Sequence, residues 1–191
     1  MFQIRVHGRG GQGVVTAAEL LSVAAFSQGR HAQAFPSFGS ERTGAPVVAF
    51  CRIDDVPIRL REPILDPDAV IVQDPTLLGQ VDVFGGLRPN GYAMVNSTRT
   101  WAELGLTDLV RGLPDGHARI VPASALALAY VHRPVPNAAL LGGFAALTGL
   151  MSLAAVEQSI AARFPSRVAA GNIEAARAAF GLVTDQIGAS L

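Results

Sequence analysis

The sequence contains no lysine, and all 15 of its basic residues are arginines. A chain without lysine can form neither a Schiff base nor the lysine–phosphate contact of a P-loop. Aspartate and glutamate together also number 15, so the formal net charge is zero. Because nucleic acids and anionic membrane surfaces select basic patches, we expect neither of them as a partner.

Charge of either sign is scarce, since 16% of the residues are charged against about 25% in a typical soluble domain. Charged residues are depleted from the cores of protein interfaces, so this composition indicates an exterior that meets other protein. The alternative explanation is a GC-rich genome that replaces lysine with arginine and adds alanine and glycine. That alternative accounts for the arginines more readily than for the low total charge.

Cysteine occurs once, at Cys51, which excludes an intrachain disulfide and a cysteine-held iron–sulfur cluster built by this chain alone. We expect Cys51 to be a small core residue. The four histidines, at positions 7, 31, 117 and 132, do not have the spacing of metal ligands, so no metal site is predicted.

The N-terminus lacks the pattern of a signal peptide, because Arg5 and Arg9 interrupt it, and we expect a cytoplasmic protein. One uncharged run, residues 138–156, is long enough to span a membrane. It is rich in Ala, Gly, Thr and Ser, and Gly149 and Ser152 indicate a break between two helices. A buried or interface-covered helix pair is therefore favoured over a transmembrane span.

Apolar periodicity predicts strands and helices that alternate through residue 131, followed by helices alone, within a single domain of residues 1–191. Strands are predicted at residues 2–6, 31–35, 47–53, 56–60, 69–73, 91–96 and 117–121. Helices are predicted at residues 12–27, 101–110, 124–131, 138–149, 153–164 and 167–187, with a short helical piece from residue 76. This order predicts an α/β protein with a three-layer Rossmann-like fold and a mostly parallel sheet, which the hairpin of residues 47–60 makes mixed.

The best-defined motif is the run His7-Gly8-Arg9-Gly10-Gly11-Gln12-Gly13, between the first predicted strand and the first predicted helix. Its glycines have the spacing of a dinucleotide-type turn, which lets the backbone bend tightly or approach a ligand. Free N–H groups at the start of the following helix favour an anion. The hypothesis is that a phosphate group or a partner chain is bound by Gly8, Arg9, Gly10, Gly11, Gln12 and Gly13. A tight turn without a ligand is the alternative.

A stand-alone nicotinamide or flavin enzyme needs an acidic residue about twenty positions beyond the glycines to hold the ribose. The corresponding strand end reads Gln33-Ala34-Phe35-Pro36 and carries no carboxylate. No Gly-x-Ser-x-Gly nucleophile motif occurs either. We therefore predict no catalytic residue in this chain.

Several polar residues near these motifs have structural interpretations. Asp74 and Asn137 are predicted to cap the helical segments that follow them, and capping of the first helix is the structural alternative for Gln12. His7 is expected to make a satisfied polar contact rather than to act as a general base. Arg9 is a candidate partner for a phosphate or for a partner carboxylate.

Five segments in order resemble the motifs of the gamma subunit of the 2-oxoacid:ferredoxin oxidoreductase family. They are the glycine run, the segment Gln33-Ala34-Phe35-Pro36-Ser37-Phe38-Gly39-Ser40-Glu41-Arg42-Thr43-Gly44-Ala45-Pro46-Val47, Asp74-Pro75-Thr76-Leu77-Leu78, Pro136-Asn137-Ala138-Ala139-Leu140-Leu141-Gly142 and Asn172-Ile173-Glu174-Ala175. The Arg-Thr-Gly-Ala-Pro form at residues 42–46 looks closer to the pyruvate-type branch, pyruvate synthase, than to the 2-oxoglutarate-type branch. Aryl-2-oxoacid and indolepyruvate enzymes share much of this signature.

The resemblance implies a complex that oxidatively decarboxylates pyruvate or a related 2-oxoacid, with coenzyme A as co-substrate, to an acyl-CoA and carbon dioxide. In that family thiamine diphosphate with Mg lies on the alpha and beta subunits. [4Fe–4S] clusters on beta and delta pass electrons to ferredoxin, or to a nicotinamide-linked subunit. The gamma chain holds none of these cofactors alone. It is expected to pack on alpha, beta and delta subunits, separate or fused, to shape the coenzyme A and substrate entrance, and to be inactive in isolation.

The loop after the second predicted strand supplies the predicted subunit interface, namely Phe38, Gly39, Glu41, Arg42 and Gly44. Such a loop is long enough to be functional, and its phenylalanines would otherwise be exposed apolar surface. A solvated turn is the alternative. Two rival functions also stay open: a stand-alone nucleotide- or coenzyme A-binding Rossmann protein, and a module that senses an acyl-CoA.

Overall fold

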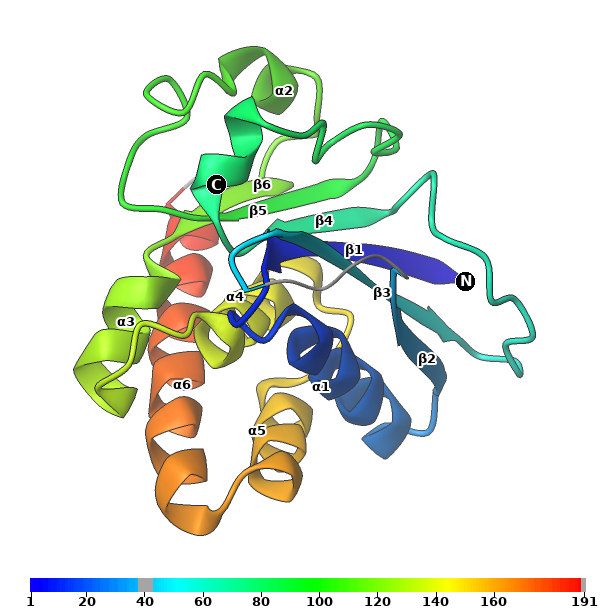
Figure 1. Cartoon of the computed structure of the whole chain (residues 1–191), viewed down its shortest axis with the longest axis vertical. Coiled ribbons are helices and arrows are strands. Elements are labelled where there is room, and N and C mark those ends of the chain that lie inside the picture. The colour runs from blue at the N-terminus through cyan, green and yellow to red at the C-terminus, as the bar shows by residue number, and fades with distance from the viewer. Residues whose placement is uncertain (38–42, 190–191) are drawn as a thin grey trace.

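The computed structural model describes residues 1–37 and 43–189 (Figure 1). Four of the predicted interface residues, Phe38, Gly39, Glu41 and Arg42, lie outside the described residues. The strands of the described part form one sheet and are β1 (Phe2–Arg9), β2 (His31–Pro36), β3 (Pro46–Asp54), β4 (Ala69–Val72), β5 (Tyr92–Asn96) and β6 (Ala118–Val121). The helices are α1 (Val14–Ser27), the 3₁₀ helix η1 (Pro75–Gly79), α2 (Thr107–Arg111), α3 (Ala123–Val131), α4 (Asn137–Thr148), α5 (Leu153–Arg163) and α6 (Ser166–Gly188).

The strand order is β2-β3-β1-β4-β5-β6, and β1, β4, β5 and β6 are parallel to their neighbours in that series. Strand β3 is antiparallel to both β1 and β2, so the mostly parallel, mixed sheet is confirmed. The hairpin of residues 47–60, from which the mixed sheet was predicted, is wrong, because residues 56–60 form no strand. Both edges of β3 are already paired, and the segment after it crosses the sheet face instead. There the Arg52 side chain donates hydrogen bonds to the carbonyls of Leu60 and Glu62.

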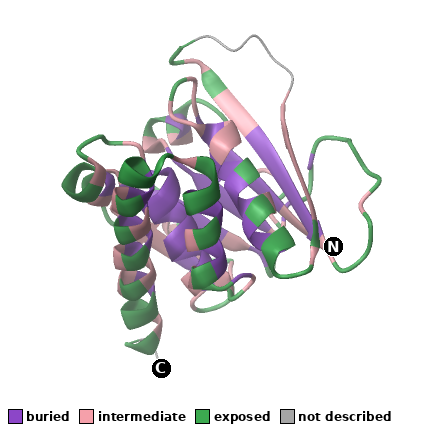
Figure 2. Ribbon diagram, turned by 90° about the horizontal axis from the view of Figure 1, so that it is seen from below, coloured by how far each residue is buried: buried purple, intermediate pink, exposed green. Residues whose placement is uncertain are grey.

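Each face of the sheet is covered, which confirms the three-layer prediction (Figure 1). Helices α1 and α3–α6 cover one face, and η1, α2 and their connecting loops cover the other. Strand β4 shows why, because it is apolar on both sides: Ala69 and Ile71 belong to the helix-covered core, whereas Val70 and Val72 pack with Leu77 of η1. Figure 2 shows the central strands and the inner helix faces largely buried and the outer helix faces exposed.

The predicted helix at residues 101–110 is mostly wrong, because only Thr107–Arg111 forms α2. A helical turn does begin there, because the Thr100 backbone N–H donates to the Glu103 carboxylate at 2.7 Å and the Leu104 N–H donates to the Thr100 carbonyl. Gly105 then has a left-handed φ of 72°, which ends the turn.

The uncharged run at residues 138–156 forms two helices, as its break signals predicted. Gly149 ends α4 in a left-handed conformation with φ 60°, and the Ser152 hydroxyl caps α5 by accepting from the Ala155 N–H at 3.2 Å. Helix α4 is almost wholly buried, and it packs closely on α6. Among the described residues, no helix combines the length and apolarity needed to cross a membrane.

Candidate functional site

Strands β1 and β4 are parallel neighbours whose following segments cross opposite faces of the sheet. After β1 the chain enters α1 on the helical face, and after β4 it enters η1 on the other face (Figure 1). The carboxyl ends of two such strands border a crevice, where α/β proteins bind ligands. The glycine run and the segment Asp74–Thr76 meet at this point.

Gly8 lies in β1 and not in the turn, because the strand extends through Arg9 and pairs with Pro46 and Val47 of β3. A Cβ at Gly8 would lie 2.7 Å from Val14 Cγ2 and 3.0 Å from Gln73 Oε1. Gly8 therefore permits α1 to pack closely on the sheet, which is a structural reason for a glycine here.

The turn itself needs glycine at two places. Gly11 and Gly13 have φ values of 92° and 72°, in the left-handed region that strongly favours glycine. A Cβ on Gly13 would collide with the side-chain nitrogen of Asn137, so both the conformation and the space exclude a larger residue. Gly10 is held by backbone hydrogen bonds to Gly44 and Ala45, which fasten the turn to the start of β3.

Gln12 and Asp74 join the glycine turn to η1. The Arg9 backbone N–H donates to Gln12 Oε1 at 2.7 Å, and Gln12 Nε2 donates to Asp74 Oδ2 at 2.8 Å. Asp74 caps η1 as predicted, because it accepts from the N–H and the hydroxyl of Thr76. Gln12 does not cap α1, whose N-cap residue is Gly13 without a side-chain cap.

The Asp74 carboxylate is held in its ionised form. Partial burial acts to raise its pKa, but hydrogen bonds from Thr76 and Gln12 and the charge of Arg9 outweigh burial, so the pKa is lowered. Arg9 Nε lies 3.2 Å from Asp74 Oδ2. The carboxylate is therefore an acceptor in a closed network and not a poised general base.

Arg9 is already occupied within the chain. Its Nη2 donates to Thr76 Oγ1 at 2.7 Å and to Gln80 Oε1 at 3.0 Å, and its Nη1 donates to the Gly44 carbonyl at 3.0 Å. The guanidinium thus ties η1, the end of β1 and the residues before β3 into one unit. Binding a phosphate through Arg9 would require breaking some of these contacts.

Asn137 does not cap α4, contrary to the prediction, since the N-cap position is Pro136 and has no side-chain cap. Its Nδ2 instead donates to the Gly13 carbonyl at 3.0 Å, and its Oδ1 accepts from Gln73 Nε2 at 2.9 Å. Asn96 in turn donates to the Gln73 carbonyl at 2.8 Å. Sequence reasoning missed this buried amide chain, although amide residues directly after β4 and at the end of β5 were a signal that could have revealed it.

His7 and Cys51 are both buried and chemically quiet. His7 is 6% exposed, and its Nε2 has no hydrogen-bond partner in the described structure, so the expected satisfied contact is wrong. Burial, with a smaller effect of the Arg5 charge, lowers the pKa of His7 to about 4. Burial raises the pKa of the Cys51 thiol to about 12, and its position in the core confirms the prediction.

Among the hollows at the carboxyl edge of the sheet, one of about 110 Å³ is lined by the turn, by residues 13–16 and by Val47. Another, of about 300 Å³, lies beside Pro75, residues 96–99, Pro122, Ser124 and Ala125. A third, of about 730 Å³, shares residues 97–99 and Pro122 with it and extends to Leu182 of α6. Ligand sites commonly measure about 300–1,000 Å³. The hollow at the turn therefore has room for one small anionic group against the uncapped start of α1, and not for a whole dinucleotide.

A metal is a separate question. In residues 1–37 and 43–189, no three His, Cys, Asp or Glu side chains gather closely enough to hold an ion. The turn thus offers backbone N–H groups, an arginine side chain that is already hydrogen-bonded within the chain, and an ionised aspartate. This arrangement can position an anion, and the residues that the structure describes here supply no free acid or base to a reaction.

Comparison with known proteins places the chain in a family. The family model described as pyruvate ferredoxin/flavodoxin oxidoreductase matches residues 3–182. The pyruvate/ketoisovalerate oxidoreductases common subunit gamma of Thermococcus kodakarensis is 46% identical over 180 residues, covering 94% of this chain and 96% of the relative. The pyruvate synthase subunit PorC of Methanothermobacter marburgensis is 44% identical with the same coverage.

A solved structure agrees with these relatives. The crystal structure of pyruvate oxidoreductase subunit PORC from Thermotoga maritima matches with a TM-score of 0.78 and 35% identity, covering 94% of this chain and 95% of that one. Together the matches confirm the resemblance to gamma subunits and the oxidoreductase class that it implied. The chain belongs to the pyruvate ferredoxin/flavodoxin oxidoreductase family.

Proposed function

We propose that this chain is the gamma subunit of a thiamine diphosphate-dependent 2-oxoacid:acceptor oxidoreductase, which converts pyruvate or a related 2-oxoacid and coenzyme A to an acyl-CoA and carbon dioxide. Alpha, beta and delta subunits, separate or fused, carry thiamine diphosphate, Mg and [4Fe–4S] clusters. Ferredoxin or a nicotinamide-linked subunit takes the electrons. The names of the relatives in Thermococcus and Methanothermobacter both include pyruvate, which supports this substrate class.

The observation that carries this proposal is an anion-competent turn that is incomplete within one chain. The hollow beside the turn measures about 110 Å³, and the nearby Arg9 and Asp74 are bound to each other and to Thr76. The single cysteine, Cys51, is buried on β3, so the chain offers no accessible thiolate to a cluster. In this proposal another chain supplies further walls and the reacting groups.

In this proposal the start of α1 faces a phosphate of coenzyme A at the junction with a partner subunit, and Gly44 lies at the same junction. The residues proposed to approach the phosphate are Gly10, Gly11 and Gly13, while Arg9 and Gln12 hold the turn in shape and Gly8 permits helix packing. Only this one group of the coenzyme fits the hollow. The remaining length of the cofactor would lie against the partner.

The rival reading is a stand-alone nucleotide- or coenzyme A-binding protein. It predicts tight binding of NAD, FAD or coenzyme A to the isolated chain, which isothermal titration measures directly. The small hollow and the occupied Arg9 weigh against it. The same titration tests the acyl-CoA sensor, which would bind the ligand without redox partners.

The deciding experiment is purification of the tagged chain under anaerobic conditions from its native host. We expect thiamine-binding and iron–sulfur chains to co-purify in fixed ratio, and the complex to reduce a viologen dye with pyruvate and coenzyme A. The isolated chain should have no such activity. A solitary particle that turns over substrate unaided would refute the proposal.

A further inference from the structure

A cavity of about 500 Å³ lies at the end of α3, away from the hollow at the glycine turn. Its walls come from residues 130–137 and from the start of α6. Two backbone features create it. Gly171 lets α6 approach the Tyr130 carbonyl, since a Cβ there would lie 2.5 Å from that oxygen. His132 ends α3 with a φ of 59°, and no other non-glycine residue in the described part of the chain has positive φ.

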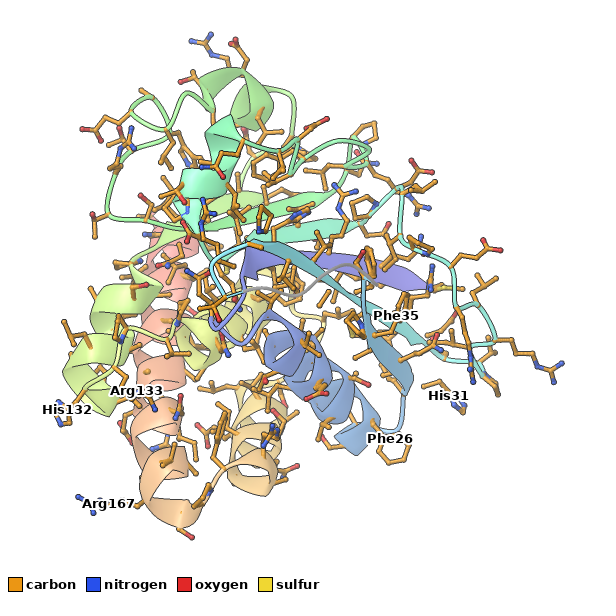
Figure 3. The ribbon with its side chains drawn as sticks, in the orientation of Figure 1. Phe26, His31, Phe35, His132, Arg133 and Arg167 are labelled. Atoms are coloured by element: carbon orange, nitrogen blue, oxygen red, sulfur yellow. The ribbon has the colours of Figure 1, made fainter. Side chains whose placement is uncertain are left out.

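The cavity is lined by three basic side chains, His132, Arg133 and Arg167. No aspartate or glutamate is among the lining residues. Figure 3 shows His132 and Arg133 at the end of α3 and Arg167 at the start of α6, on the same side of the molecule. Within the described residues neither arginine belongs to an ion pair, whereas Arg177 further along α6 pairs with Glu157 and Glu174.

Exposed apolar side chains surround the basic groups. Leu128 is 55% exposed, Tyr130 44% and Val168 41%, and Phe164 forms part of the cavity wall. Tyrosine and arginine are enriched at the positions that contribute most to binding in protein interfaces. Exposed apolar side chains beside them indicate surface that another protein covers. A small molecule inside the cavity would leave Leu128 uncovered, because Leu128 is not part of the lining.

We propose that this cavity and its apolar rim dock an acidic segment of another subunit, with a carboxylate between Arg133 and Arg167 and an adjacent apolar side chain in the cavity. The inference rests on the proposed function, because it takes its partner from the same complex. Charge complementarity specifies the partner, since two arginines that form no ion pair among the described residues, in a cavity with no acid in its lining, match a carboxylate. Asn137 belongs to the cavity wall and also binds the Gly13 carbonyl, so the docked segment touches the framework of the glycine turn.

Photo-crosslinking in the intact complex identifies the occupant. A benzophenone amino acid replaces Tyr130, the assembled complex is irradiated, and crosslinked peptides are sequenced by mass spectrometry. We expect a peptide of another subunit that contains aspartate or glutamate. A complex that stays assembled and active but gives crosslinks only within this chain would overturn the docking surface while leaving the proposed function standing.

Charge reversal tests the two arginines. In Arg133→Glu/Arg167→Glu, association with the other subunits should weaken about tenfold or more, because like charges then face each other. The matched control is Arg59→Glu/Arg61→Glu, which makes the same change of net charge at two exposed arginines outside the cavity that also belong to no ion pair among the described residues. Both double variants should keep the melting temperature of the isolated chain, since all four arginines are exposed.

Reciprocal charge reversal completes the test. Changing the crosslinked acidic residue to arginine should restore the association of Arg133→Glu/Arg167→Glu, and it should weaken that of the unaltered chain. Association of the double variant at unchanged affinity would contradict the proposal. So would stabilisation of the isolated chain by coenzyme A or ATP that depends on these arginines, because the cavity would then be a small-molecule site.

Discussion

At the scale of single residues, the carboxyl edge of the sheet is organised by side chains that bind one another. Asp74 shows this best, because it caps η1, accepts from Gln12 and lies 3.2 Å from Arg9 Nε. The contacts with Gln12 and Arg9 join segments that are far apart in the sequence. The turn is therefore rigid before any ligand or partner arrives, which is what an anion-binding backbone requires.

The charge of Asp74 can be tested apart from its capping role by Asp74→Asn, since asparagine caps helices as well as aspartate does. We expect the wild-type chain to be more stable by about 1 kcal/mol at neutral pH, from its charge-assisted hydrogen bonds. The folded pKa of Asp74 is lowered, so this advantage is present above the ordinary aspartate pKa and is lost as the pH falls through the folded value. Urea unfolding of both proteins at neutral and acid pH measures it. An equal gap at both pH values would contradict the assignment.

His7 predicts a second pH dependence with its own window. Its pKa is about 4 in the folded chain and 6.5 ordinarily. Between these two pH values His7 is therefore protonated in the unfolded chain and neutral in the folded chain. Stability should fall as the pH is lowered through this window, by up to about 1.4 kcal/mol per pH unit. The variant His7→Gln should lack this slope, whatever its absolute stability. Urea unfolding at several pH values compares the two slopes, and parallel curves would show that His7 is not buried in its neutral form.

At the scale of elements, segments with regular apolar patterns were predictable and segments decided by distant partners were not. Helix α1 was predicted at residues 12–27 and spans Val14–Ser27, because its apolar face and the glycine that follows it are local signals. The strand predicted at residues 56–60 failed because pairing depends on which edges of β3 are already taken. The predicted helix at residues 101–110 failed because Gly105 has a left-handed φ of 72° and interrupts it after one turn.

The candidate site also combines features that local sequence patterns predict with features that depend on distant residues. The cap of η1 was readable from the sequence Asp74-Pro75-Thr76, whose members are adjacent. The contact of Asn137 with Gly13 joins residues 124 positions apart, and no local pattern contains that information. The Arg9 side chain likewise donates a hydrogen bond to Gln80, which lies 71 residues away in the sequence.

Two glycines test how closely the helices of the covered face pack. A Cβ at Gly142 of α4 would overlap the backbone of Ala176 in α6, whereas a Cβ at Gly181 of α6 would meet nothing within 4 Å. We expect Gly142→Ala to destabilise the chain by about 1–3 kcal/mol through overpacking. Gly181→Ala should instead stabilise it by about 0.5–1 kcal/mol, because alanine has the higher helix propensity. Thermal unfolding of both variants measures the contrast, and a common sign would show that α4 and α6 are not in this contact.

At the scale of the whole molecule, the glycine turn and the basic cavity at the end of α3 are separate surfaces joined by one side chain. Asn137 is 5% exposed, lines the cavity and donates to the Gly13 carbonyl at the start of α1. A partner seated in the cavity would therefore restrain the residue that holds the turn. Assembly and anion binding are expected to be coupled, because both depend on the same buried amide chain.

Hydrogen exchange tests this coupling in the isolated chain and in the assembled complex. We expect amides of residues 10–16 to exchange more slowly after assembly, and to slow further when coenzyme A is added to the complex. Coenzyme A added to the isolated chain should change little, since the hollow at the turn accepts only one small group. The buried strand β4 is the internal control, because its amides are protected in both states. If coenzyme A alone protected the turn and assembly did not, the chain would be a self-sufficient ligand-binding protein, and its likeness to gamma subunits would be one of ancestry rather than of present role.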